Sequence, residues 1–184
     1  MGRSKLDLPW GGRSLLDHAV ETLGQAGADP IRAVVSEPRD IRGCVSIVNP
    51  RASEGMTTSL ACGLHASAAA EITVVHLCDL PTVSAEMIGK LVAAVASGFP
   101  AAAACFENTV GPPIVVSQSV SRRLRDHLSN PNARAKTFLL GLDAELERVD
   151  LPSAANDVDT PDRYLALHQK TFGFAPSVDF AHGR

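Results

Sequence analysis

Residues 72–81, ITVVHLCDLP, decide the fold. Their first six residues form an almost unbroken apolar run, which is typical of a strand buried on both faces in a parallel sheet covered by helices. Asp79 lies two residues after the end of this run. Because ligands of such sheets bind beyond the carboxyl ends of the strands, Asp79 and its neighbours are the first candidates for a functional site.

Outward from this strand, short β-branched or apolar segments alternate with amphipathic segments. Further strands are expected at residues 31–36, 44–49, 101–106, 113–117 and 145–151. Helices are expected at residues 14–27, 54–70, 84–98, 119–128, 134–141 and 160–173. Ser84 is the expected N-cap of the third helix. The last helix has Thr160 as its expected cap and Pro161 at its first position. This alternation predicts an α/β layered domain with a largely parallel sheet over residues 1–174, followed by a loose tail at residues 175–184.

Composition excludes several classes of protein. The chain has 184 residues, 45% of them hydrophobic, and a formal net charge of −3, whereas nonspecific nucleic-acid binding usually needs a basic excess. No apolar run approaches the roughly 18 residues that span a membrane, and no secretory segment opens the chain. The four cysteines are far apart and form no CxxC pair. We expect a soluble, cytoplasmic protein with reduced thiols.

Two groups of carboxylates are candidates for metal chemistry. Asp79 lies just past the buried strand, and Asp157 and Asp159 precede the last helix, two residues apart, so that their side chains point the same way on an extended segment. Mg²⁺ prefers oxygen ligands and is often held by one or two carboxylates plus substrate phosphates. The alternative is that Asp79 caps a turn and that the second pair simply precedes a capped helix.

The segment at residues 49–64, NPRASEGMTTSLACGL, leaves a strand and enters a helix opened by Ser53 or Glu54. Its hydroxyl groups, among them Ser59, lie near a helix N-terminus, where an anion or a base edge can be held. Equally, they can be N-cap and solvent-facing residues.

In sequence order, MGRSKLDLPWGGRSLLDH, NPRASEGMTTSLACGL, CDLP, GPPIVV and DVDTPDRYLAL resemble the nucleotidyltransferases of the molybdenum cofactor cytidylyltransferase type, over nearly the whole chain. The resemblance implies a Rossmann-like three-layer α/β domain. It also implies transfer of a nucleoside monophosphate from CTP or GTP to a phosphorylated, molybdopterin-type acceptor, with Mg²⁺ and release of pyrophosphate.

The resemblance assigns roles to residues by match. Lys5 matches the lysine after the family's phosphate loop, Asp79 matches its first metal-binding aspartate, and Asp157 or Asp159 matches its second. The substrate-binding residues implied are Arg3, Ser53, Gly55, Ser59 and Gly111. Similar sequences usually have Gly-His-Pro where this chain has Gly-Pro-Pro at residues 111–113.

In this family a first strand and a glycine-rich loop of the form L-A-A-G-x-S-x-R stand before the Met-Gly with which this sequence begins. Two explanations are open, a misassigned start or a truncated homologue. We expect a gap or an unpaired edge beside residues 72–77, with rearranged N-terminal residues or a second copy of the chain covering it. Two functions are open as well: a cytidylyl- or guanylyltransferase, or an inactive relative that serves as a binding or maturation factor for a molybdenum hydroxylase.

Overall fold

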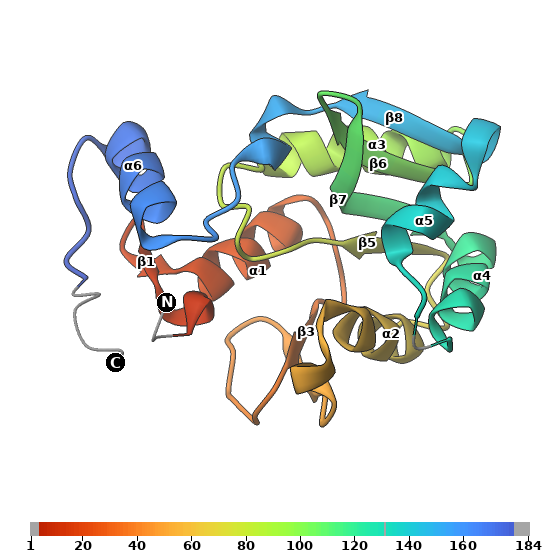
Figure 1. Ribbon diagram of the computed structural model, residues 1–184, viewed down its shortest axis with the longest axis horizontal. Helices are drawn as coiled ribbons and strands as arrows, with labels where there is room; N and C mark the ends of the chain where they lie inside the picture. The colour runs from red at the N-terminus through yellow and green to blue at the C-terminus, as the bar shows by residue number, and fades with distance from the viewer. Residues whose placement is uncertain (1–3, 131, 179–184) are drawn as a thin grey trace.

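The four-stranded sheet, the largest of three in the described residues, carries most of the core. The computed structural model describes residues 4–130 and 132–178. The sheet has the order β5-β7-β6-β8, and its strands are β5 (Ile72–Val75), β7 (Thr109–Ser117), β6 (Ala101–Phe106) and β8 (Leu146–Asp150) (Figure 1). β7 is antiparallel to β5 and to β6, and β6 is parallel to β8, so β5, β6 and β8 all run in one direction. The prediction of a largely parallel sheet in an α/β domain is confirmed.

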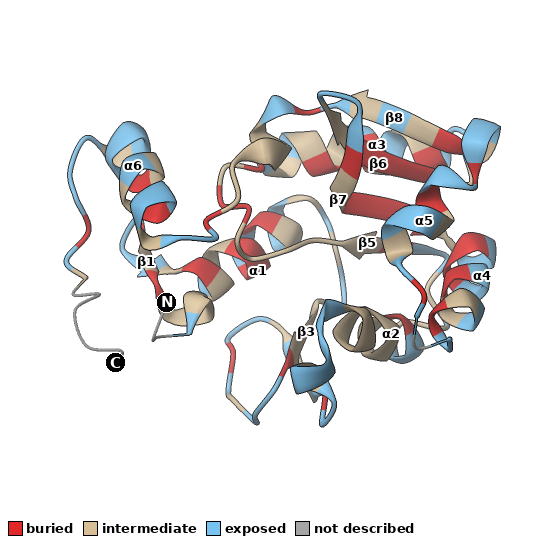
Figure 2. Cartoon of the chain, viewed as in Figure 1, coloured by how far each residue is buried: buried red, intermediate tan, exposed pale blue. Residues whose placement is uncertain are grey.

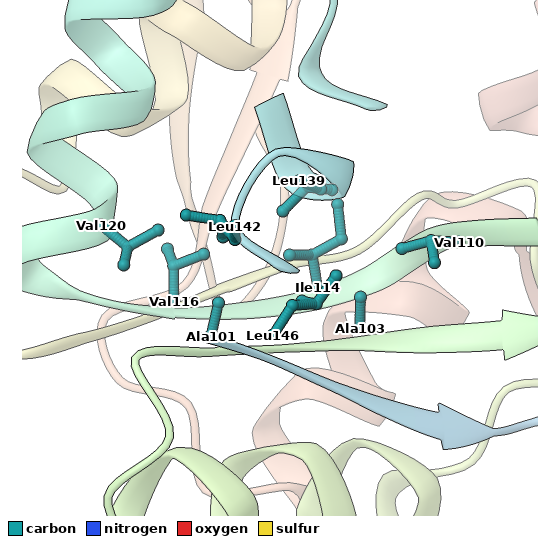
Figure 3. Packing of buried hydrophobic residues seen from close by; sticks show 9 residues of the cluster. All are labelled: Ala101, Ala103, Val110, Ile114, Val116, Val120, Leu139, Leu142 and Leu146. Atoms are coloured by element: carbon teal, nitrogen blue, oxygen red, sulfur yellow. The ribbon is translucent and has the colours of Figure 1, made fainter. Parts of the chain in front are cut away.

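Helices cover both faces of this sheet and give it three layers. Alternate residues of β6 point to opposite faces, as the strand period requires. One face packs against α4 (Gln118–Leu128) and α5 (Ala135–Leu140), where Ala101 and Ala103 meet Val120, Leu139 and Leu142 (Figure 3). The other face packs against α3 (Ala85–Ala96), where Ala102 and Ala104 meet Leu91 and Val95. The small alanine side chains of β6 let these helices approach the sheet closely.

The second sheet is separate. β3 (Arg32–Val35) pairs in parallel with β4 (Val45–Val48), and α2 (Met56–Ala66) packs on β3. Within the described residues, no ladder joins β3 to β5, whose ladder partner is β7. The expected gap beside residues 72–77 is therefore confirmed. Both faces of β5 are packed, as expected: Val74 lies in clusters with residues of α3, and Val75 lies in a cluster with Leu124 of α4. Burial is incomplete, because one edge of β5 is unpaired among the described residues: Thr73 is its one buried residue, whereas β6 and β7 are buried over much of their length (Figure 2).

The two ends of the described chain meet beside α1 (Leu15–Gln25). The N-terminal part forms a short hairpin, β1 (Pro9–Trp10) with β2 (Arg13–Ser14), and α6 (Pro161–Phe172) packs on it through Trp10 and Tyr164 (Figure 1). Of the tail expected to be loose, Pro176 is buried and Val178 packs on this aromatic cluster, while residues 179–184 lie outside the described part.

Helix starts follow the predicted capping with one exception. The hydroxyls of Ser84 and Thr160 accept bonds from backbone N–H groups at the start of α3 and α6, as expected. α2 begins at Gly55 instead of Ser53 or Glu54, which lie in a short 3-10 helix, Ala52–Glu54. Gly55 has φ 113°, a conformation that favours glycine, and this residue turns the chain into α2. No helix of the described residues is long and apolar enough to cross a membrane.

Candidate active site at the end of β5

The loop after β5 is fastened to the segment before α6. Val158 N–H donates to the Asp79 carbonyl at 3.0 Å, and Val158 is fully buried. Thr82 Oγ1 donates to the Ser153 carbonyl at 3.1 Å, and Asn156 Nδ2 donates to Thr82 Oγ1 at 3.3 Å. These bonds join the loop after β5 to the segment before α6, which are far apart in the sequence. Each of the two segments carries one of the predicted groups of carboxylates.

Lys5 lies between these carboxylates. It opens a short 3-10 helix, Lys5–Asp7, and its ammonium donates to Asp159 Oδ1 while lying 3.7 Å from Asp79 Oδ2. The side chains of Lys5 and Asp79 are 33% and 22% exposed. Asp79 and Asp159 thus lie on the same rim of the sheet, both within ion-pair distance of one ammonium, and their role as metal ligands stays a prediction.

Burial dominates the electrostatics of Asp79. Its pKa is raised, first by burial and also by the charge of Asp159, against the opposing charge of Lys5. Its Oδ1 atom is buried and has no hydrogen-bond partner among the described residues. The pKa of Lys5 is lowered by burial, but the bond to Asp159 and the charges of both aspartates outweigh this and raise it overall. The ammonium therefore stays charged.

Asp157 and Asp159 interact with each other, and their pKa values shift in opposite directions. Burial raises the pKa of Asp157, and the bond to Asp159 adds to this, whereas the bonds to Lys5 and then to Asp157 lower the pKa of Asp159. Arg163 Nη2 lies 2.6 Å from Asp157 Oδ1 and also donates to the Ala155 carbonyl. Sequence reasoning missed Arg163; its place in the first turn of the helix that follows the acidic pair is the signal that points to it.

The donor set suits a hard divalent cation. Within the described residues, no group of three or more His, Cys, Asp or Glu side chains surrounds a common point as a complete metal site. Asp79 nevertheless presents a buried carboxylate oxygen with no partner, and carboxylate oxygens are the ligands that Mg²⁺ prefers. Mg²⁺ usually keeps water and takes substrate phosphates as its other ligands, so two carboxylates are sufficient protein ligands.

The hydroxyls after β4 form a second group. Asn49 is buried, and its Nδ2 donates to Thr58 Oγ1 and to Ser59 Oγ at 3.0 Å each, which fixes the first turn of α2 on β4. Ser53 is exposed, and Gly55 is the N-cap of α2. The interactions described for the chain do not join this group to Lys5. Asn49 was not predicted as its organiser, although its place just after a strand is a usable signal.

Two predicted residues remain, Gly111 and Arg3. Gly111 is in β7, paired with Ala104 beside an irregularity that accommodates residues 112 and 113. Arg3 lies outside the described residues. His18, which was not predicted, donates a 2.8 Å hydrogen bond from Nε2–H to the Pro81 carbonyl and so holds the loop after β5 against α1.

A cavity of about 990 Å³ lies elsewhere, between α1 and the connection from β3 to β4. Charged side chains of both signs line it, including Arg13, Asp17, Glu21, Asp40 and Arg42. Because it is wide open and does not include the Lys5 cluster, the candidate site rests on the geometry of the carboxylates and not on this hollow.

Known proteins with similar sequences include a family of nucleotidyltransferase domains. Residues 1–146 match the family described as the MobA-like NTP transferase domain. A molybdenum cofactor guanylyltransferase from Xanthomonas euvesicatoria is 39% identical over 93 residues, which span 50% of this chain and 47% of that protein. The chain thus matches about half the length of this curated relative.

Solved structures show the same fold. A nucleotidyl transferase from Methanothermobacter thermautotroptrophicus superposes with a TM-score of 0.73 at 19% identity, covering 90% of this chain and 84% of that one. A molybdopterin-guanine dinucleotide biosynthesis protein A from Archaeoglobus fulgidus superposes with a TM-score of 0.69 at 14% identity, covering 94% and 93%. The fold is the Rossmann-like α/β fold of nucleotidyltransferases.

Proposed function

This chain belongs to the family of MobA-like NTP transferase domains, and from that premise we propose that it transfers a nucleoside monophosphate from an NTP to a molybdopterin-type acceptor. An oxygen of the acceptor phosphate attacks the α-phosphorus of the nucleotide, the bond from that phosphorus to the bridging oxygen breaks, and pyrophosphate leaves. The observation that carries the proposal is the Lys5 ammonium lying between Asp79 and Asp159.

The chemistry of the reaction explains these residue types. Nucleotidyl transfer builds negative charge on phosphate oxygens, so catalysis is mainly positioning and charge neutralisation. Lys5 would contact the triphosphate and neutralise part of that charge. Asp79 and Asp159 would hold Mg²⁺, which supplies further charge neutralisation when bound. The bond from Val158 to the Asp79 carbonyl keeps the two carboxylates at a fixed separation, and Arg163 orients Asp157 beside them.

We propose GTP as the nucleotide, with CTP as the alternative. The 39% identical relative is named a guanylyltransferase, and this name is the observation that favours GTP. Calorimetric titration of each nucleotide with Mg²⁺ into the chain compares their affinities directly, and a transfer assay with molybdopterin then identifies the dinucleotide formed.

The decisive variant is Asp79→Asn, with Asp126→Asn as its matched control. Both changes remove one carboxylate and keep the side-chain size, but Asp126 is exposed on α4. We expect Asp79→Asn to lower the rate of transfer by about 10² or more, the scale of losing one charge-stabilising group in a site, and Asp126→Asn to leave it unchanged. Equal rates in all three proteins would refute the proposed site. Nucleotide binding without transfer in the unmodified chain would instead favour the role of a binding or maturation factor.

A further inference from the structure

We propose that Lys5 is a built-in competitor of the metal ion: its ammonium holds the place between Asp79 and Asp159, and a divalent cation enters only when Lys5 leaves. The inference rests on the proposed function and deepens it by assigning an order of events to the site. It predicts that the nucleotide opens the metal site by attracting Lys5 away from the carboxylates.

The geometry supports a single cation position. One ammonium serves two carboxylates, donating to Asp159 Oδ1 and lying within ion-pair distance of Asp79 Oδ2. Asp79 Oδ1, on the buried side of the same carboxylate, has no partner among the described residues. A divalent ion bound through these oxygens would lie within a few ångströms of the Lys5 ammonium, and two cations so close repel each other strongly in a partly buried site. Metal and ammonium therefore exclude each other.

The local structure around Lys5 allows its side chain to move away from the carboxylates. It belongs to a helical turn of three residues, and Ser4 before it makes no side-chain cap. The described partners of its ammonium are the two carboxylates alone. A lysine has a flexible four-carbon stem and binds phosphate as a compact charge, so a triphosphate offers it an equivalent anionic partner. A nucleotide that attracts Lys5 frees both carboxylates, and nucleotide and metal then bind with positive coupling.

The test is Mn²⁺ binding without nucleotide, measured by the electron paramagnetic resonance signal of free Mn²⁺. The variants are Lys5→Met, Lys5→Arg and, as the matched control, Lys90→Met, which removes an exposed lysine paired with Glu86 on α3. Lys5→Met should bind Mn²⁺ about tenfold more tightly than the unmodified chain, equivalent to about 1.4 kcal/mol. Lys5→Arg keeps the competing charge, so it and Lys90→Met should bind as the unmodified chain does.

Adding the nucleotide gives a second measurement, in which Lys5→Met should weaken binding where it strengthened Mn²⁺ binding before. In the unmodified chain, GTP or CTP should tighten Mn²⁺ binding, and in Lys5→Met this coupling should fall while the affinity for the nucleotide itself decreases. A merely structural role for Lys5 would lower both affinities together. If Lys5→Met failed to fold, as judged by circular dichroism, the coupling in the unmodified chain and in Lys5→Arg would decide the proposal alone, and its absence would overturn it.

Failure of this inference and failure of the proposed function give different results. Unchanged or weaker Mn²⁺ binding in Lys5→Met, with binding lost in Asp79→Asn, would overturn the competition and leave the metal site intact. Mn²⁺ binding that persists at full affinity in Asp79→Asn would overturn both, because the carboxylate that defines the site would not hold the metal.

Discussion

Replacing His76 with leucine should remove much of the acid sensitivity of the fold. His76 follows β5, its Nδ1 atom is buried without a partner among the described residues, and burial, together with the charge of His18, lowers its pKa from 6.5 to about 4. The unfolded chain binds a proton at this histidine below about pH 6.5, whereas the folded chain does so only below about pH 4. Stability from His76 is therefore fully present above about pH 6.5, is lost as the pH falls from there to about 4, and changes no further below that.

The magnitude follows from these two values. Between about pH 7.5 and pH 5.5 the unmodified chain should lose about 1.4 kcal/mol of unfolding free energy through His76 alone, out of a full loss of about 3 kcal/mol by pH 4. Urea unfolding at several pH values measures this, and His76→Leu should show a slope shallower by that amount. The pKa of His18 is also lowered, mainly by burial, so some acid sensitivity remains in the variant.

His65→Leu is the matched control, since this histidine is exposed on α2, and the slope should stay that of the unmodified chain. Parallel loss of stability in His76→Leu and the unmodified chain over this range would refute the reasoning, because it would show that burial does not hold His76 neutral.

Three further substitutions test the packing by unfolding in urea. Leu64→Ala should lower the unfolding free energy by about 3 kcal/mol, because it leaves a cavity. Met56, on the same helix, is 66% exposed, so Met56→Ala should change stability by less than about 0.5 kcal/mol. Equal effects of the two substitutions would contradict the assigned core. Tyr164→Phe should cost about 1 kcal/mol, because the hydroxyl donates to the Pro9 carbonyl, and no change would count against that bond. Asn49→Ala should cost about 2 kcal/mol by leaving two hydroxyls of α2 without their donor; a neutral result would show that solvent replaces it.

The parts of the site that follow from local pattern could be predicted. Asp79 after an apolar strand, and Asp157 and Asp159 before a capped helix, are visible as short motifs, and Lys5 came from family resemblance. The bond from Val158 to the Asp79 carbonyl could not be predicted, because it depends on how two distant segments meet in space.

Helices and strands could be predicted where their hydrophobic pattern extends over many residues, whereas the order of the strands in the sheets could not. The alanines of β6 and the capped helices were anticipated, but the hairpin of β1 and β2 was missed, because strands of two residues are shorter than any readable period. The antiparallel pairing of β5 with β7 was also missed, since strand order and direction are not encoded in apolar character.

The division between the two sheets has a mechanical consequence. Among the described residues, two helices connect the β3–β4 sheet to the four-stranded sheet. In α1, Val20 packs with Val35 of β3 and Leu23 lies in a cluster with Val74 of β5. In α2, Gly63 lies so close to β3 that an added Cβ would be 3.2 Å from Val34 Cγ2, while Leu64 packs with Leu124 of α4 in a cluster that includes Val75 of β5. A continuous sheet transmits force through its hydrogen bonds and resists bending as one stiff slab. Here the two sheets are joined by helix packing and, within the described residues, by no ladder, so hydrogen bonds between strands do not fix the Asn49 network relative to the Asp79 loop.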